Sequence, residues 1–187
     1  MNINIVLIAS VLFFLSEFTL MIAKRSKKAR TKESKDKKSL VLFWITIPLA
    51  ISIGFFAANY QTWNSVNKTV AIVGLSIFII GILIRWISIL GLNKEFTVDV
   101  SITENHTLKT DGIYKNIRHP SYLGLFIECF GLSLAMNSFI SILVVNIPIL
   151  LVILYRIKIE ENILIEEFGD AYRNYMKVSN KLLPKIF

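Results

Sequence analysis

Residues 69–92 read TVAIVGLSIFIIGILIRWISILGL, an apolar block with one charged residue, Arg85. At about 1.5 Å per residue, a helix of this length crosses the ~30 Å hydrocarbon core of a bilayer. The apolar residues of a soluble helix would instead recur about every 3.6 positions and leave a polar face. We therefore expect residues 69–92 to form a transmembrane helix.

Four more apolar blocks lie along the chain, at residues 3–22, 40–58, 121–136 and 139–155. Pro48 lies inside the second of these blocks, where a kink is expected. The last two blocks are short and are separated by Asn137 and Ser138, which favours a tight helical hairpin. The sequence thus predicts an all-α, multi-pass membrane protein with five transmembrane helices, forming a single domain over residues 1–187.

The distribution of basic residues predicts the orientation of the chain in the membrane. The formal net charge is +8, and nine of the 21 basic residues lie between Lys24 and Lys38. Such a cluster directly after an apolar block is typical of a cytosolic loop that faces anionic lipid headgroups. Basic and aromatic residues do not alternate, so a nucleic-acid partner is not expected. We expect the N-terminus to lie outside, and the basic loop and the C-terminus to be cytosolic.

Several kinds of site are not expected from the composition. Cys129 is the one cysteine, so there is no disulfide framework and no cysteine-based metal site, and no metal ion is expected. The eight glycines form neither GxGxxG nor a phosphate-binding loop. Glu17 and Glu128 lie inside apolar blocks, where each would face a cavity or lie near the membrane interface; their roles stay open.

Residues 93–120 form a polar stretch that is too long for an ordinary connection, and we expect it to be functional. Proline is favoured in the first turn of a helix, so Pro120 predicts a helix that begins after His119. The positive dipole end of that helix would attract a carboxylate, and Arg118 adds a cation. An ordinary helix start beside an interfacial arginine explains the same residues.

Residues 156–177 are expected to form one amphipathic cytosolic helix. Spacing by four places Arg156 and Glu160 on one face with Leu164 and Phe168. The opposite, solvated face carries Lys158, Glu166, Asp170, Arg173 and Lys177. Charges directed toward protein or lipid are unfavourable unless they are paired or used. Arg156 and Glu160 are therefore candidate functional residues, although a simple ion pair within the helix would explain them too.

Taken together, these clusters resemble the isoprenylcysteine carboxyl methyltransferase family. The resemblance is carried by His106-Thr107-Leu108, Gly112-Ile113-Tyr114, Arg118-His119-Pro120-Ser121-Tyr122-Leu123-Gly124, Arg156, Glu160-Glu161, Phe168-Gly169, Tyr172, Tyr175 and Leu183-Pro184. The Arg-His-Pro-x-Tyr element alone also occurs in related membrane methyltransferases and in membrane sterol reductases. The motifs span roughly Arg85 to Pro184, and the first two spans match the family only as hydrophobic helices. We therefore expect residues 1–68 to form two N-terminal helices with the basic loop, and the resemblance implies that residues 69–187 form a catalytic methyltransferase core.

The resemblance also implies a methyl donor, S-adenosylmethionine, with S-adenosylhomocysteine as its product. The donor would lie in a cytosolic pocket between the loop before the fourth helix and the C-terminal helix. The residues implied in this donor site are His106, Thr107, Leu108, Lys109, Tyr114, His119, Pro120, Ser121, Tyr122 and Glu160. Arg156 is the implied catalytic residue, which would orient the carboxylate of a prenylated cysteine arriving from the lipid side.

The sequence departs from animal members of the family before His106. Phe96-Thr97 stands where they carry Phe-Asn, and Asp99 lies near a glutamine that contacts the donor, so a part for Thr97 or Asp99 in the site stays open. A phospholipid amine or a small thiol derivative could also serve as the acceptor. The same residues are compatible with an NADPH-dependent membrane reductase and with a non-enzymatic transporter or scaffold, and the sequence does not predict the oligomeric state.

Overall fold

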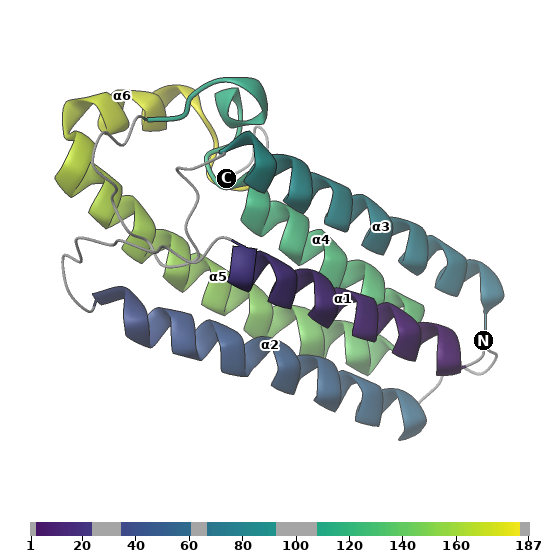
Figure 1. Cartoon of the computed structure of the whole chain (residues 1–187). Helices are drawn as coiled ribbons and strands as arrows, with labels where there is room; N and C mark the ends of the chain where they lie inside the picture. Colours follow the sequence, from purple (N-terminus) through teal and green to yellow (C-terminus); the bar gives the residue numbers. More distant parts are fainter. Residues whose placement is uncertain (1–2, 24–34, 61–66, 93–107, 184–187) are drawn as a thin grey trace.

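The structure, a computed structural model, describes residues 3–23, 35–60, 67–92 and 108–183. Within these ranges the chain is helical, and the predicted all-α class is confirmed for them (Figure 1). The elements are α1 (Ile3–Ala23), α2 (Lys35–Tyr60), α3 (Lys68–Gly91), the 3-10 helix η1 (Gly112–Lys115), α4 (Pro120–Ala135), α5 (Phe139–Phe168) and α6 (Asp170–Val178).

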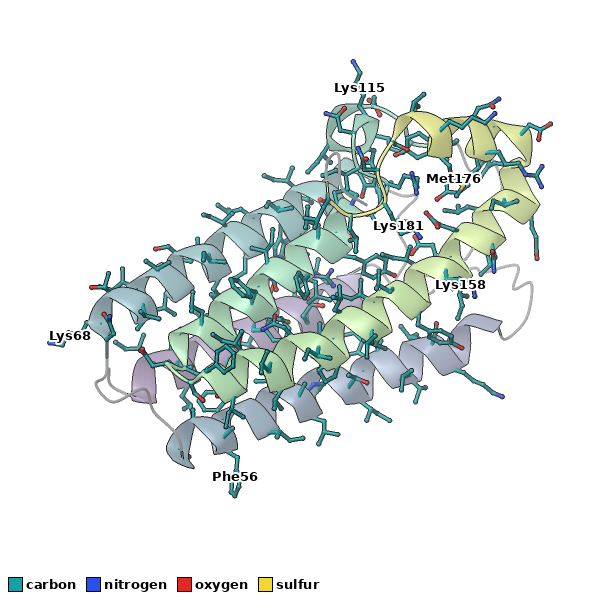
Figure 2. All side chains as sticks on the ribbon, turned by 180° about the vertical axis from the view of Figure 1, so that it is seen from behind. Phe56, Lys68, Lys115, Lys158, Met176 and Lys181 are labelled. Atoms are coloured by element: carbon teal, nitrogen blue, oxygen red, sulfur yellow. The ribbon has the colours of Figure 1, made fainter. Side chains whose placement is uncertain are left out.

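The five long helices lie side by side, and consecutive helices run in opposite directions (Figure 1). α3 packs along α4, α2 packs along α5, and α4 also contacts α5 and α1. One end of the bundle, here called the site end, carries η1, the start of α4, the last turns of α5, and α6. The opposite end, here called the far end, carries the start of α3 and the turn between α4 and α5; Lys68 marks it in Figure 2.

The outer surface of the bundle is apolar, as expected for contact with lipid. On α3, for example, Ile72 is 62% exposed and Leu83 is 55% exposed. An apolar surface that extends over several helices is unfavourable in water and indicates an integral membrane protein. Three described helical segments, Lys38–Asn59, Lys68–Gly91 and Phe139–Phe168, are long and apolar enough to cross a membrane, and two shorter apolar segments are Ile5–Leu20 and Pro120–Ala135. That α1 and α4 also cross the bilayer stays a prediction.

Glycines allow α3 and α4 to approach each other closely. Gly74 and Gly81 of α3 face α4, while Gly124 and Gly131 of α4 face α3. A Cβ atom on Gly131 would lie 2.3 Å from the backbone nitrogen of Phe78, which no side chain can tolerate without a shift of the helices. Small residues at such positions are the usual means by which membrane helices pack closely. The contact made by these four glycines, here called the glycine seam, sets the position of α4 against α3 and hence the position of the first turn of α4.

The predicted hairpin between the last two apolar blocks is confirmed. Asn137 adopts a left-handed conformation with a φ of 57°, which reverses the chain after α4. Ser138 then caps α5, because its side chain accepts a hydrogen bond from the backbone N–H of Ser141 at 3.2 Å.

The prediction that one helix ends at Tyr155 and a separate amphipathic helix covers residues 156–177 is wrong. α5 continues without a break to Phe168, because neither glycine nor proline interrupts residues 156–168. The break comes at Gly169, whose φ of +55° is readily adopted only by glycine, and α6 then turns across the site end (Figure 1). Arg156 therefore lies well inside a long helix and not at the start of a surface one.

Candidate active site

The start of α4 carries polar residues that are buried. Pro120 occupies the first turn and His119 is the N-cap residue, so the predicted helix start is confirmed. The residue His119 is only 4% exposed, and Ser121 is 7% exposed. A histidine at a solvated helix start would be open to water, so its burial calls for partners within the protein.

His119 finds these partners in two adjacent carboxylates of α5. Its Nε2 lies 3.3 Å from Oε1 of Glu161, and its Nδ1 lies 3.9 Å from Oε2 of Glu160. Arg118 donates from Nε to the same Glu161 oxygen at 3.0 Å, and Lys181 Nζ lies 3.8 Å from the other oxygen. Glu161 thus joins α5, the start of α4 and the segment after α6, and these cations compensate for its burial.

The segment after α6 returns to the start of α4 and runs beside it. The backbone N–H of Arg118 donates to the carbonyl of Asn180 at 2.8 Å, and that of His119 donates to the carbonyl of Lys181 at 3.2 Å. The Arg118 guanidinium also donates to the carbonyl oxygen of Ser179. The position of His119 is therefore fixed from the backbone as well as from the side chain.

Two tyrosines attach η1 to its neighbours. The Tyr175 hydroxyl donates to the carbonyl of Tyr114, and the Tyr114 hydroxyl donates to the carbonyl of Ser88 at 3.2 Å. Burial raises the pKa of Tyr175 to about 12. Burial, together with the nearby charge of Glu160, raises the pKa of Tyr114 still further. Both hydroxyls therefore stay protonated donors at neutral pH.

In Figure 2, Lys115 of η1 points away from the bundle, whereas Met176 and Lys181 lie on the inner side of the bend between α5 and α6.

Arg156 is buried one turn of α5 before Glu160 and is held by two other helices. Its exposure is 3%, and its Nε donates to the hydroxyl of Tyr122 on α4 at 2.8 Å. Its Nη1 donates to the hydroxyl of Ser39 on α2 at 3.3 Å. The guanidinium carbon lies 5.6 Å from the centre of the Phe43 ring, within the range of a cation–π contact. Arg156 is thus a positioned cation in an aromatic environment.

Glu160 connects the Arg156 group with the histidine group. Its carboxylate is an electrostatic neighbour of Tyr122, the same residue that accepts a hydrogen bond from Arg156. Its Oε2 is buried and has no hydrogen-bond partner among the described residues, because His119 Nδ1 at 3.9 Å is beyond hydrogen-bond range. A buried carboxylate oxygen without a donor is unfavourable. The arrangement therefore suits a ligand that brings a hydrogen-bond donor to this oxygen.

Most of the site residues predicted from the sequence lie in this region. Those gathered at the site end are Tyr114, His119, Pro120, Ser121, Tyr122, Arg156 and Glu160. Leu108 and Lys109 are half-buried, and Lys109 pairs with Asp111 at 2.8 Å. The residues that lie outside the described part of the chain are Thr97, Asp99, His106 and Thr107. Within the described ranges, no group of three or more His, Cys, Asp and Glu side chains is placed to hold a metal ion.

The sequence interpretation missed the ion pair that supports the start of α4. Arg85 of α3 binds both carboxylate oxygens of Glu17 on α1, with 2.6 Å between Nη2 and Oε2, and donates from Nη1 to the carbonyl of Ser121 at 3.0 Å. Charges inside apolar blocks are the signal that could have found it. Glu128 is also fully buried, and neither of its carboxylate oxygens has a hydrogen-bond partner in the described part of the chain.

The sequence did not predict that Ser39 and Phe43 lie beside Arg156. It indicated Glu161 only as part of the Glu160-Glu161 motif, with no role of its own. Ser39 lies at the end of a lysine-rich segment and Phe43 lies in an apolar block, so neither has a sequence signal of its own. Glu161 could have been found from its place beside Glu160, since a second acidic residue next to a candidate site residue needs a partner when it is buried.

Comparisons with known proteins identify relatives of this chain. The chain is 33% identical over 136 residues to a protein-S-isoprenylcysteine O-methyltransferase of Schizosaccharomyces pombe, covering 72% of this chain and 53% of the relative. It is 28% identical over 173 residues to protein-S-isoprenylcysteine O-methyltransferase B of Arabidopsis thaliana, covering 90% of this chain and 85% of the relative. This chain thus spans about half the length of the first relative and most of the second.

A solved structure supports the same relationship. The eukaryotic intramembrane Ras methyltransferase ICMT matches with a TM-score of 0.66 and 25% sequence identity, over 95% of this chain and 64% of that chain. The model of the isoprenylcysteine carboxyl methyltransferase (ICMT) family matches residues 72–166, which contain α4 and most of α3 and α5. Because this match covers just over half of its length, the chain belongs to the isoprenylcysteine carboxyl methyltransferase family.

Proposed function

We propose that this protein transfers a methyl group from S-adenosylmethionine to the carboxylate of a prenylated cysteine or of a similar isoprenoid. One observation carries the proposal beyond the family relationship. Glu160 presents a buried carboxylate oxygen that has no donor among the described residues, and Arg156, one helical turn away, presents a guanidinium that donates to Tyr122. The two charges suit two ligands, one that brings a hydrogen-bond donor and one that brings a carboxylate.

On the donor side, the described residues fit S-adenosylmethionine. Its ammonium and hydroxyl groups are hydrogen-bond donors of the kind that the described residues do not supply to Oε2 of Glu160. When bound, it supplies a methyl group made electrophilic by a sulfonium. On the strength of the family resemblance, the proposed donor site also includes His106, Thr107, Leu108, Lys109, Tyr114, His119, Pro120, Ser121 and Tyr122.

On the acceptor side, Arg156 would hold the carboxylate, since a guanidinium can bind both oxygens of a carboxylate at once. A carboxylate oxygen then forms a bond to the methyl carbon as the carbon–sulfur bond breaks, and the electron pair of that bond stays on sulfur. The products are a methyl ester and S-adenosylhomocysteine, and no proton is transferred. The residues therefore need only to orient the reactants and exclude water, and the chemistry calls for no general base.

We further propose that five helices span the membrane, α1 and α4 included, with the site end facing the cytosol. α1 runs toward the site end and α2 begins on that side (Figure 1), and in the sequence the basic residues from Lys24 to Lys38 lie between the end of α1 and the first turn of α2. Basic residues between membrane helices favour the cytosolic side. With this topology the N-terminus is outside, and an isoprenoid acceptor reaches Arg156 from the surrounding lipid.

Calorimetry on the detergent-solubilised protein tests the donor assignment. S-adenosylhomocysteine is expected to bind and to raise the melting temperature, whereas NADPH is expected to do neither. An absence of binding, or protection by NADPH in its place, contradicts the proposal and favours a reductase or a non-enzymatic protein.

Methyl transfer to S-farnesyl-N-acetylcysteine tests the acceptor assignment. Arg156→Lys is expected to lower the rate by about 100-fold, because lysine cannot reproduce the two parallel hydrogen bonds of a guanidinium. Arg173→Lys on the exposed face of α6 is the matched control. Equal rates for both variants, or transfer to phosphatidylethanolamine or to a small thiol in preference to the farnesylated cysteine, would show that the acceptor is assigned wrongly.

A further inference from the structure

α2 contributes to the surroundings of Arg156, although it lies outside the part of the chain that the family model matches. That match begins at residue 72, whereas α2 covers Lys35–Tyr60. Ser39 of α2 is fully buried, and Phe43, one turn later, is 4% exposed. Both face Arg156, so this helix brings a hydroxyl and an aromatic ring to the cation.

These contacts restrict the guanidinium in two ways. Hydrogen bonds to Tyr122 at 2.8 Å and to Ser39 at 3.3 Å come from helices α4 and α2, so they fix the orientation of the group. The Phe43 ring lies 5.6 Å from the guanidinium carbon and also packs against the Tyr122 ring, with 6.3 Å between ring centres. An arginine held in this way loses less conformational entropy when it binds a carboxylate.

We propose that Ser39 and Phe43 are acceptor-positioning residues, which set the orientation of Arg156 for the carboxylate of the isoprenoid acceptor. The inference rests on the proposed function and extends it to a helix that the family model does not match. Ser39 and Phe43 act through Arg156 and not on the methyl donor, whose proposed site centres on Glu160 and His119. Their loss therefore weakens acceptor binding selectively.

Steady-state kinetics on Ser39→Ala test this inference, with S-farnesyl-N-acetylcysteine and S-adenosylmethionine each varied. The KM for the farnesylated cysteine is expected to rise roughly tenfold, the scale of one hydrogen bond to a charged group. The KM for the donor and the affinity for S-adenosylhomocysteine are expected to stay unchanged. Ser39→Thr keeps the hydroxyl and is expected to restore the KM for the acceptor.

Ser133→Ala is the matched control, because Ser133 is fully buried too but lies on α4 away from the site, where its hydroxyl donates to the carbonyl of Phe130. Should Ser39→Ala fail to fold, Phe43→Leu, which keeps an apolar side chain but removes the ring face, gives the same test. An unchanged KM for the acceptor, or an equal rise in KM for both substrates, overturns the inference. A wild-type protein that neither binds S-adenosylhomocysteine nor transfers methyl refutes the proposed function itself.

Discussion

The two ends of the bundle both bury polar side chains, but they bury different kinds. At the site end the buried groups include charged or ionisable side chains, as in Arg118, His119 and Glu161, besides neutral hydroxyls such as Ser121. At the far end they are neutral amides and hydroxyls, as in Asn137 and Ser141. Burying a charge is far less favourable than burying an amide, so charges are retained where they have a use.

The neutral groups of the far end serve the helices themselves. The Asn67 side chain caps α3, and the Asn137 amide donates to the carbonyl of Asn67 at 3.2 Å. The Ser141 hydroxyl donates to the carbonyl of Gly54 at 2.7 Å and so joins α5 to α2. The Asn67 side chain satisfies N–H groups that the start of α3 leaves unpaired, and the other two hydrogen bonds join neighbouring segments of the bundle. The fold therefore explains the donors among these groups, whereas the amide oxygen of Asn137 is buried and has no hydrogen-bond partner in the described part of the chain.

The site end has more buried charged side chains than are required to satisfy the unpaired backbone groups of its helix termini. Arg118 does satisfy the Ser179 carbonyl after α6, but the Arg156 guanidinium donates to side chains of two other helices, Tyr122 and Ser39. The comparison therefore predicts that substitutions at the far end lower stability alone, whereas substitutions at the site end also change ligand binding. The following experiments test that division.

Arg118→Ala is expected to have the largest effect on stability. It removes the bonds to Glu161 and to the Ser179 carbonyl, and it leaves a carboxylate that is only 8% exposed with weaker compensation. Loss of one partner of a buried pair destabilises a protein by about 3 kcal/mol. Thermal unfolding in detergent measures this loss. Arg173→Ala is the control, since the exposed pair with Asp170 is expected to contribute less than about 1 kcal/mol. Equal melting temperatures for the two variants would show that the Arg118 cluster does not hold the site end together.

Asn146→Ala tests the far end with a smaller effect. The amide donates to the Ser133 hydroxyl at 2.8 Å and to the Ile142 carbonyl at 2.7 Å, so its loss is expected to destabilise the protein by about 2 kcal/mol. The affinity for S-adenosylhomocysteine, measured by calorimetry, is expected to match the wild type. A weaker affinity would show that the far end is coupled to the site.

Sequence patterns predicted most of the helices, but not where α5 ends or which helices pack together. Apolar blocks set α3 correctly to within a residue or two, and the Asn137-Ser138 turn was predicted because turn residues interrupt an apolar run. The end of α5 was placed wrongly, because a change from apolar to charged residues at Arg156 does not end a helix. The helix ends instead at Gly169, because this glycine has a positive φ.

The sequence singled out residues that the fold brings together, but it did not predict which of them contact one another; their role in a site stays a prediction. His119, Arg156 and Glu160 were selected from the sequence because charged or ionisable residues beside apolar segments are unfavourable unless they are paired or functional. Ser39 is a neutral residue before an apolar block, and its contact with Arg156 depends on how α2 packs against α5. Pairing across distant helices is a property of packing, on which a single sequence carries no direct information.

Glu160→Gln tests whether the charge of Glu160 at the site end contributes to binding of the methyl donor. Glutamine keeps the size of the side chain but removes its charge, so the affinity for S-adenosylhomocysteine is expected to fall about tenfold, or about 1.4 kcal/mol. The melting temperature is expected to change little, because the Glu160 side chain is 25% exposed. Glu167→Gln, on the exposed surface of the same helix, is the control for the loss of one negative charge. Unchanged affinity in the Glu160 variant would exclude this carboxylate from the donor site.

Asn67→Ala is expected to have the smallest effect, and it separates a capping role from a ligand role. The Asn67 side chain accepts hydrogen bonds from the N–H groups of Thr69 and Val70, at 3.0 and 3.4 Å. Loss of an N-cap of this kind lowers stability by about 1 kcal/mol. Asn67→Ser, which keeps a capping oxygen, is expected to melt close to the wild type, and both variants are expected to bind S-adenosylhomocysteine normally. If the alanine variant alone bound the product more weakly, the start of α3 would be transmitting its position along the glycine seam to Arg85 and the first turn of α4, and the far end would no longer be only structural.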